Sequence, residues 1–592
     1  YHSRRSPVLG THASVASSQP LASEIGVRIL KAGGNAVDAA VAVAAALNAV
    51  TEPCSTGLGG DCFMLYYDAS TKQVHGMNSS GRAPAALTLE RTLADLAAAA
   101  PPGPPPPPPD ELPKHHPHTV TVPGAAAGWV EAVAKLGSGA LTLAEILEPA
   151  AALAEGGFPV SPITANFWAK GAAADLHSSP NGGELLMGSG AAPRAGEVFR
   201  NPSLARVMRE LGARGRDGFY KGWVAKAVVG QLRGMGGVMT LEDLENHRTD
   251  FLDPISVEFG GIRVHEVPPS GQGITALLAL NILKQLGAEP AGDATAAAAT
   301  AAAAAGAAAA AAPLSEDSKE GPAEVGEVEE EAEVPYLHRL IEAMRMAFAD
   351  TRWFCADPEH VEVPMEELLT EAYAEERSKL FDPTRSSVDV CRGSPTKSSC
   401  TVSFQVVDKQ GNAVSFVNSN YHGFGTGIVP KGCGFSLQNR GQNFSLNASH
   451  PNVLAPGKRP YHTIIPCMLT VEETGELYAT LTNMGGFMQP QGHVQLVMNL
   501  LGRRMDPQAA IDAPRFCITD GRSGGRVAVE EGFAPGTAEA LKAMGHDVVM
   551  LGGYDREMFG RAQQIILRDT SGEVPVLWAG SDGRADGCAI AW

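Results

Sequence analysis

The sequence lacks several features that would place it in a well-defined class. It has nine cysteines in 592 residues, with no CxxC pair, and the closest two lie eight residues apart. Zinc sites and disulfide-rich scaffolds need tighter or more regular cysteine spacing. We therefore expect reduced, mostly buried thiols and a cytoplasmic environment. The chain begins with Tyr1 rather than Met, which leaves room for an upstream targeting segment.

Long apolar runs and basic stretches are also missing. Apart from an alanine tract, no apolar run reaches the length of a membrane-spanning helix, so we expect no membrane span. The net charge is −19, from 46 basic and 65 acidic residues. Residues 316–333 contribute −8 of this, with nine acids and one lysine, which leaves −11 for the rest. A body this acidic excludes nucleic acid as an expected partner, because binding to phosphates needs a basic surface.

The first half of the chain has mainly helical patterns. Residues 20–48 predict two helices broken at Gly33 and Gly34, and the second is apolar almost all round, which indicates a buried helix. Further patterns predict strands at 62–69 and 72–78 and helices within 125–155, 203–234 and 337–354.

Two low-complexity segments interrupt this pattern. Residues 101–118 are proline-rich and predict an extended loop. Residues 291–333 form an Ala/Thr/Gly tract followed by an acidic stretch. With no polar–apolar periodicity the tract has no face to pack, so we expect an insert that loops out of a helical layer, with its acidic half disordered.

Short strands and glycine-rich turns follow residue 401. The runs TVSFQVV and AVSFVN flank the turn DKQGN, which predicts a hairpin with Gly411 in a left-handed conformation. Other strands are expected at 463–471, 477–482, 526–530, 542–551 and 563–570, with helices near 490–501 and 536–544. Helices first and strands later predict an α+β fold of stacked layers.

Three short patterns carry little functional information. The sequence GRSGG contains Ser523 in a Gly-x-Ser-x-Gly pattern, but a strand-like run follows it where a nucleophile elbow needs a helix. The HHPH run at 115–118 lies in the proline-rich loop, and we interpret it as exposed. GFGTG at 423–427 lacks the Lys-Ser/Thr of a phosphate loop.

Thr401 is the residue with the clearest catalytic potential. A threonine at a chain terminus combines a nucleophilic hydroxyl with a base, because its own α-amine, with a pKa of about 8, can take the proton. From the hairpin alone, however, an ordinary β-branched strand residue is the favoured interpretation.

A resemblance distributed along the chain changes that interpretation. The sequence resembles the γ-glutamyltranspeptidase family of N-terminal-nucleophile hydrolases, in a divergent branch similar to oxamate amidohydrolase and acylase-like members. The resemblance covers nearly the whole chain except the two low-complexity segments. It rests on the motifs ILKAGGNAVDAAVA (29–42), GLGGDCFML (57–65), TVPGAAAGW (121–129), DGFYKG (217–222), VPPSGQGI (267–274), EAMRMAFADTRWF (342–354), CTVSFQVVDKQGNAVSF (400–416), FGTGIV (424–429), GKRPYHTIIP (457–466), MGGFMQPQGH (484–493), AIDAPRF (510–516) and SDGRADG (581–587).

The resemblance implies a fold and a reaction. The fold is a four-layer αββα sandwich made as one precursor, which cleaves itself between Cys400 and Thr401. The large chain, 1–400, and the small chain, 401–592, would remain associated. Thr401 would attack an amide carbonyl to form an acyl-enzyme, and the amides of Gly485 and Gly486 would bind the oxyanion. The chemistry requires no metal or organic cofactor.

Several positions depart from the family pattern. Ser419 replaces a second threonine. Ser80 replaces an arginine that binds the donor's carboxylate, and Arg82 is a candidate substitute. The remaining substrate-binding positions align with Tyr421, Arg440, Asn443, His462 and Thr463.

The loss of an aspartate at Asn443 is the most informative departure. A γ-glutamyl donor carries an ammonium group, whose natural partner is a carboxylate. Neutral Asn443 together with cationic Arg440 would disfavour that donor by about 1–4 kcal/mol at short range. The same arginine suits an anionic amide without an amino group, although a purely structural ion pair explains Arg440 equally well.

Three functional hypotheses follow. The default is a self-processing γ-glutamyl hydrolase or transferase acting on glutathione-like amides. The alternative is an amidohydrolase for a small acidic amide that prefers water as acceptor. A third is an uncleaved, non-catalytic scaffold, which the joint presence of Thr401, Ser419, Gly485 and Gly486 disfavours.

Overall fold

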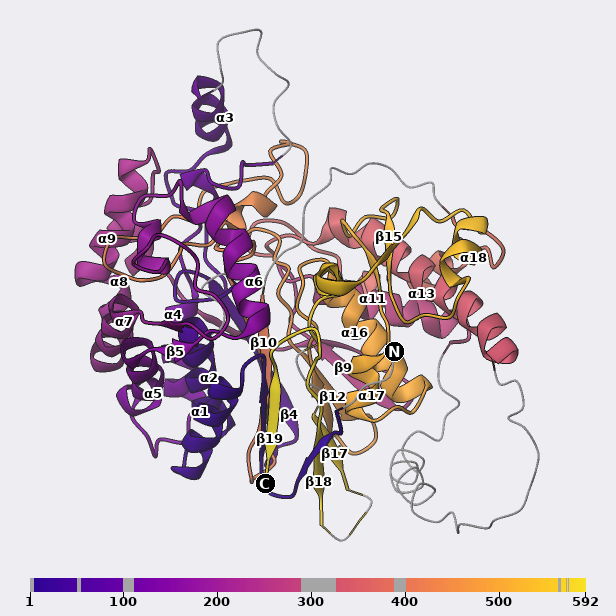
Figure 1. Cartoon of the computed structure of the whole chain (residues 1–592). Coiled ribbons are helices and arrows are strands. Elements are labelled where there is room, and N and C mark those ends of the chain that lie inside the picture. Colours follow the sequence, from indigo (N-terminus) through magenta and orange to yellow (C-terminus); the bar gives the residue numbers. More distant parts are fainter. Residues whose placement is uncertain are drawn as a thin grey trace.

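The structure is a computed structural model that describes residues 5–50, 55–99, 111–288, 326–387, 401–562, 566–570, 572 and 574–592. Two seven-stranded sheets lie at its centre, and helices flank them on both sides (Figure 1). This is a mixed helix and sheet fold, as the order of predicted elements indicated.

The first sheet contains the hairpin that begins next to Thr401. Its strands run in the order β19 (Cys588–Ala591), β2 (Ser14–Ser17), β10 (Val402–Val407), β11 (Ala413–Ser419), β3 (Asp61–Asp68), β4 (Gln73–Ser79) and β7 (Asp250–Leu252). All neighbours are antiparallel. The hairpin turn has Gly411 at φ 86°, which confirms the left-handed glycine predicted there.

The second sheet faces the first. Its order is β1 (Val8–Gly10), β18 (Val576–Ala579), β17 (Ile566–Asp569), β13 (Leu477–Leu481), β12 (Cys467–Val471), β9 (Ile262–Glu266) and β8 (Ile255–Phe259). Both sheets therefore mix strands from before and after Thr401. A cleavage at that point would leave two chains joined by complete ladders of backbone hydrogen bonds.

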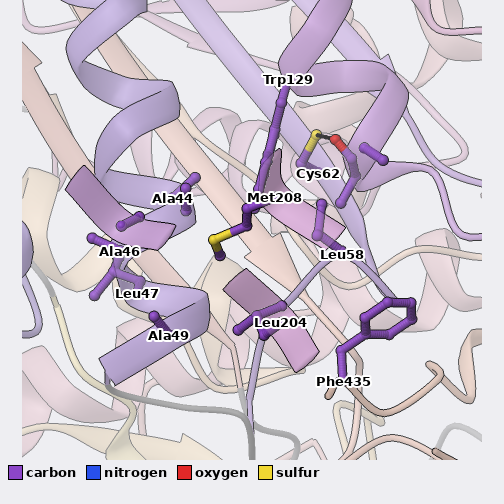
Figure 2. Packing of buried hydrophobic residues seen from close by; sticks show 14 of the residues in the cluster. Ala44, Ala46, Leu47, Ala49, Leu58, Cys62, Trp129, Leu204, Met208 and Phe435 are labelled. Carbon is purple, nitrogen blue, oxygen red and sulfur yellow. Dashed lines mark hydrogen bonds between the residues drawn. The ribbon is translucent and has the colours of Figure 1, made fainter. Parts of the chain in front are cut away.

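Helices cover the outer face of the first sheet. They include α1 (Pro20–Lys31), α2 (Ala36–Val50), α4 (Ala125–Leu136), α5 (Leu143–Gly156), α7 (Pro202–Arg214) and α9 (Gly222–Gly234). The break between α1 and α2 falls at the predicted glycine pair. All 15 residues of α2 are buried, as its uniformly apolar sequence predicted. Figure 2 shows side chains from α2, α4 and α7 packed together, among them Leu47, Trp129 and Met208.

A second helical layer covers the second sheet. It is built from α11 (Gly273–Gln285), α13 (Gly326–Phe354), α16 (Met488–Val497), α17 (Pro507–Asp512) and α18 (Thr537–Ala543). A third, smaller core lies between the sheets and takes residues from both, such as Phe63, Val417 and Met468. Every strand near the site is thus packed on two faces, which holds its end in a fixed position.

The structure corrects three local predictions. Helix α13 starts at Gly326, so the last part of the acidic stretch is helical rather than disordered; glutamate is a good helix former and the segment continues a strong helix. Strand β12 starts at Cys467 rather than 463, because the preceding residues turn into the site. His118 is buried and bonds Asp95 at 2.8 Å, so this part of the HHPH run is not exposed.

Other predicted segments lie outside the described residues. They are 101–110 of the proline-rich loop, 291–325 of the insert, and Cys400 at the predicted cleavage point. Among the helices that the structure does describe, none combines the length and apolarity needed to cross a bilayer.

Candidate active site

Thr401 lies at one end of the first sheet, in a row of polar residues from neighbouring strands. Val402 pairs with Asn418, so Thr401 stands opposite Ser419, the last residue of β11. Ser419 in turn pairs with Asp61, the first residue of β3. Thr401, Ser419 and Asp61 are all fully buried. The antiparallel register therefore brings together three side chains from distant parts of the sequence.

Ser419 is the residue in direct contact with the Thr401 hydroxyl. Its Oγ lies 3.2 Å from Thr401 Oγ1. The same oxygen accepts hydrogen bonds from the Tyr421 amide at 2.8 Å and from Arg440 Nη2 at 3.2 Å. The two hydroxyls are thus within hydrogen-bond distance, and either of them can donate to the other.

Arg440 is the positive charge of the site. It begins a short 3₁₀ helix, Arg440–Asn443, and is completely buried. Besides Ser419 it donates to Thr463 Oγ1 at 2.7 Å, and its guanidinium lies over the Tyr421 ring at 4.6 Å. Burial lowers the pKa of Arg440 to about 10, although the nearby Asp61 acts in the opposite direction. Arg440 is therefore still charged at neutral pH.

Asp61 is the counter-charge to Arg440. Its Oδ1 accepts hydrogen bonds from the Gly81 amide, the Gly124 amide and Gln438 Nε2, at 3.0, 3.1 and 3.0 Å. Desolvation by burial raises the pKa of Asp61 to about 6, even though Arg440 and these hydrogen bonds favour the carboxylate. Asp61 is therefore an acid whose protonation changes close to neutral pH.

His462 completes the set around Asp61. Its Nε2 lies 3.1 Å from Asp61 Oδ2, and its Nδ1 accepts from the Ile464 amide at 3.3 Å. The second bond places the proton on Nε2, which then donates to Asp61. Burial, together with Arg440 and Arg459, lowers the pKa of His462 far below its ordinary value, so the ring is neutral.

Gly485 and Gly486 lie in the turn between β13 and α16. They adopt φ values of 129° and 62°, and a Cβ on Gly485 would lie 3.1 Å from Gly560 Cα. Glycine at both positions therefore avoids strain. Gln272 Nε2 joins this turn to the residues around Thr401, because it donates to Gly486 O at 2.8 Å and to Thr463 O at 2.7 Å. We call these residues the Thr401 cluster: Asp61, Gln272, Thr401, Ser419, Tyr421, Gln438, Arg440, His462 and Thr463. Among the described residues, neither glycine amide donates a hydrogen bond.

Tyr421 has an unusual backbone conformation for a bulky residue, with φ 76°. This conformation turns its amide onto Ser419 Oγ and its ring under Arg440. Burial raises the pKa of the Tyr421 phenol to about 12, so the hydroxyl is neutral. Strained residues of this kind are common where a site is held in one arrangement.

Two of the predicted substrate-binding residues are not joined to the cluster by the contacts that the structure describes. Arg82 Nη2 binds Asp250 at 3.3 Å and Glu359 at 3.0 Å, both carboxylates of a separate ion-pair group. Asn443 accepts from Asn452 through its backbone oxygen at 2.7 Å, while its buried Nδ2 has no hydrogen-bond partner among the described residues. Their roles in substrate binding remain predictions, as does cleavage at Cys400.

Sequence reasoning missed several residues of the cluster. Asp61, Gln272 and Gln438 were not predicted, although Asp61 stands out in GLGGDCFML as the one charge before a wholly apolar strand. A charged residue in such a strand is rarely buried without a partner. The glutamines have no comparable signal, since their hydrogen bonds depend on segments far apart in the chain.

Two buried groups elsewhere hold atoms that could bind a metal ion. They are Glu266, Cys467 and His493, and His338, Glu342 and His546, with ligand atoms within 4.8 Å of one another. Hydrogen bonds within each group explain the proximity, with His493 Nδ1 2.6 Å from Glu266 Oε1 and His338 Nδ1 2.8 Å from His546 Nε2. Neither group contains a residue of the Thr401 cluster.

Comparison with known proteins points to one family. The family model for gamma-glutamyltranspeptidase matches residues 22–592. The glutathione hydrolase-like YwrD proenzyme of Bacillus subtilis is 35% identical over 98% of this chain and 99% of its own length. The oxamate amidohydrolase proenzyme of Klebsiella pneumoniae is 31% identical over 99% of both chains.

A solved structure has the same overall fold. Cephalosporin acylase from Bacillus halodurans superimposes with a TM-score of 0.82 and 38% sequence identity, covering 100% of this chain and 98% of the acylase. The relatives are named as hydrolases, amidohydrolases or acylases, and several are named as proenzymes.

Proposed function

The chain belongs to the γ-glutamyltranspeptidase family of amidohydrolases and acylases, and from that premise we propose that it is a self-processing threonine amidohydrolase. Its donor would be an amide of a small anionic acyl group, with water as the preferred acceptor. We also assign its two sheets and two helical layers to the four-layer αββα sandwich of N-terminal-nucleophile hydrolases.

The reaction we propose starts with hydrolysis of the peptide bond between Cys400 and Thr401, which consumes water and leaves a carboxylate on Cys400. Cleavage frees the α-amine of Thr401, which takes the proton of the Thr401 hydroxyl as Oγ1 attacks the donor's carbonyl carbon. The amides of Gly485 and Gly486 stabilise the oxyanion, and Ser419 orients Thr401 Oγ1. Collapse breaks the C–N bond, and the leaving amine takes the proton from the α-ammonium. Water, activated by the α-amine, then hydrolyses the ester and releases the acid.

One observation carries the choice of donor: the charge beside the nucleophile is an arginine, and the nearest carboxylate is already engaged. Asp61 accepts three hydrogen bonds at Oδ1 and one from His462 at Oδ2. A donor's ammonium group would therefore meet Arg440 without an available carboxylate in the cluster. An anionic acyl group without an amino group avoids this repulsion.

A γ-glutamyl donor is the second candidate. It is favoured by the name of the Bacillus subtilis relative, a glutathione hydrolase-like proenzyme. The two candidates differ in whether the α-amino group of the donor helps or hinders turnover. We expect the deaminated analogue of a γ-glutamyl amide to have a kcat/KM about 10-fold or more above that of the γ-glutamyl amide itself.

Intact-mass spectrometry tests the processing step first. Wild type should give two fragments that break before Thr401, and Thr401→Ala should stay whole. Ser403→Ala is the matched control, because Ser403 is buried in the strand that follows Thr401 and its hydroxyl has no hydrogen-bond partner in the part of the chain that the structure describes. A single uncleaved mass for wild type after long incubation at optimal pH would contradict the enzyme hypothesis and favour the scaffold.

A further inference from the structure

Arg352 is a cation near the Thr401 cluster that has no carboxylate partner among the residues that the structure describes. It lies in the last turn of α13, and its guanidinium carbon is 4.7 Å from the Phe487 ring and 5.4 Å from the Tyr461 ring. Burial raises the pKa of the Tyr461 hydroxyl, and the nearby positive charge of Arg352 acts in the opposite direction. Within the part of the chain that the structure describes, no carboxylate forms an ion pair with it. A guanidinium has five N–H donors, so contact with two ring faces leaves donors available for an anion.

The other arginines near the site differ in this respect. Arg440 is buried beside Asp61, and its donors reach Ser419 and Thr463. Arg82 binds Asp250 and Glu359. Arg459 binds Asp250 at 2.5 Å. Arg82 and Arg459 thus form ion pairs and Arg440 has Asp61 nearby, whereas Arg352 has no carboxylate partner in the described part of the chain.

The position of Arg352 connects it to the reacting groups. Phe487 directly follows Gly486, and the Tyr461 hydroxyl donates to Gln272 Oε1 at 2.8 Å. Gln272 in turn donates to the backbone oxygens of Gly486 and Thr463. Phe487 thus continues the segment that presents the proposed oxyanion amides, and Tyr461 is joined to that segment through Gln272. The positive charge of Arg352 also reaches Tyr421 in the cluster.

We propose that Arg352 binds the carboxylate of the donor amide, and that Phe487 and Tyr461 form the apolar wall along the carbon chain between that carboxylate and the scissile carbonyl. This inference rests on the proposed amidohydrolase function and specifies its substrate class. A guanidinium stacked on rings can bind a carboxylate through two parallel hydrogen bonds, which a lysine cannot reproduce. The donor would be a monoamide of a dicarboxylic acid.

Glu111 is a negative charge that acts on Tyr421, but among the described residues it forms no ion pair with Arg352. Burial is the main cause of the raised pKa of Tyr421, and the negative charge of Glu111 adds to it. Glu111 itself forms an ion pair with Arg522 at 3.9 Å. His450 packs against Trp353 at 5.0 Å, and burial together with Arg352 lowers its pKa, so it is a neutral neighbour. The anion that Arg352 lacks within the described part of the protein would be supplied by the donor.

Kinetics on a donor series tests the proposal. Monoamides of dicarboxylic acids with two to six carbons are compared with their neutral methyl esters, using wild type, Arg352→Met and Arg352→Lys. For the preferred monoamide we expect Arg352→Met to lower kcat/KM by about 10- to 100-fold, mainly through KM. The ester should change by less than about 2-fold. Lysine should restore only part of the loss.

Arg503→Met is the matched control. Arg503 also lies over a ring, that of Tyr336, at 4.3 Å, but in the described part of the chain it contacts no residue of the cluster. Self-cleavage and thermal unfolding of each variant show whether the fold is intact. The proposal is wrong if Arg352→Met slows monoamide and ester equally, or if the preference for the monoamide is unchanged.

A binding measurement separates this proposal from the proposed function. Wild type and Arg352→Met are titrated by calorimetry with the free dicarboxylates of the same lengths. One outcome is that wild type hydrolyses no amide and still binds a dicarboxylate at least 10-fold more tightly than the variant. That result would contradict the proposed amidohydrolase function and support carboxylate binding by Arg352. Equal binding by both proteins, or none by wild type, would overturn the role of Arg352.

Discussion

Two groups of buried charges in this protein differ in whether their opposite charges form ion pairs. In the first group, Arg584 forms ion pairs with Glu530 at 2.5 Å and with Asp582 at 3.1 Å. Arg515 binds the same Asp582 at 3.0 Å. Around Arg440, the neighbouring carboxylate of Asp61 bonds backbone amides, Gln438 and His462 instead. The first group pairs charges directly; the second holds them near one another without an ion pair.

The pKa values of the two groups reflect this difference. Burial would raise the pKa of Asp582, but Arg515 and Arg584 outweigh it and hold that pKa below the usual range. Burial of Asp61 is not outweighed, and its pKa rises to about 6. A network that stabilises the fold keeps its charges at all ordinary pH values, while a group poised near neutrality is typical of functional sites. The four predictions below test this contrast.

The largest expected effect is on stability at the Arg584 group. Arg584→Met leaves Glu530 and Asp582 buried with one partner fewer, and we expect the free energy of unfolding to fall by about 3–5 kcal/mol. Arg440→Met should cost less, because Asp61 can be protonated near pH 6. Urea denaturation measures both. Arg526→Met is the control, since its ion pair with Asp547 is exposed and should contribute no more than about 1 kcal/mol. Equal losses for Arg584→Met and Arg440→Met would remove the contrast.

The pH dependence of stability should identify Asp61. Because its pKa is raised in the folded state, its protonated form stabilises the fold fully below pH 4, and this contribution disappears as the pH rises through about 6. Over that interval wild type should lose about 3 kcal/mol more of unfolding free energy than Asp61→Asn. Denaturation curves at several pH values measure the difference. Asp582→Asn should show the opposite sign, losing stability relative to wild type towards higher pH. Parallel curves for wild type and Asp61→Asn would contradict the raised pKa.

Loss of the Ser419 hydroxyl should mainly affect catalysis. Ser419→Ala removes the group beside Thr401 Oγ1, and we expect kcat to fall by about 100-fold, roughly 2.7 kcal/mol. Ser419→Thr keeps the hydroxyl and should retain most activity. Steady-state kinetics on processed enzyme provides the measurement. If alanine and threonine behave alike, Ser419 does not orient the nucleophile.

The smallest expected effect is at Arg82. Its two carboxylate partners lie in a partly exposed ion-pair group, so Arg82→Met should lower stability by about 1 kcal/mol or less and change KM by less than about 2-fold. Steady-state kinetics with the preferred donor tests this, with Arg248→Met, from the same ion-pair group, as control. If Arg82→Met alone weakened apparent donor binding by about 10-fold or more, the prediction that Arg82 binds substrate would be supported.

Much of the fold could be predicted from local patterns. The uniformly apolar run that forms α2, the glycine pair before it and the turn glycine of the β10–β11 hairpin each specify a conformation within a few residues. The acidic start of α13 was mispredicted, because composition alone did not show that its glutamates continue an adjacent helix. The predicted looping out of residues 291–325 and the predicted cleavage after Cys400 lie outside the described residues and stay predictions.

The candidate site was only partly predictable. Thr401, Ser419, Arg440, His462 and Thr463 were found through the family resemblance, and the structure brings them together. Asp61 and Gln272 were not found. The resemblance assigned roles only to positions that match the family's functional residues. It gave no information about Asp61 and Gln272, whose contacts with the site depend on the tertiary structure.

What the sequence by itself determined is the set of elements and the position of a threonine at the start of a strand, because these depend on neighbours within one or two turns of chain. What only the tertiary structure decided is which charges meet. Strand register placed Asp61 beside Ser419, and burial raised the pKa of Asp61. Carboxylates from other segments form ion pairs with Arg82, whereas none in the described part of the chain does so with Arg352. Electrostatic energies depend on distances and burial between segments far apart in the chain, and no local pattern encodes them.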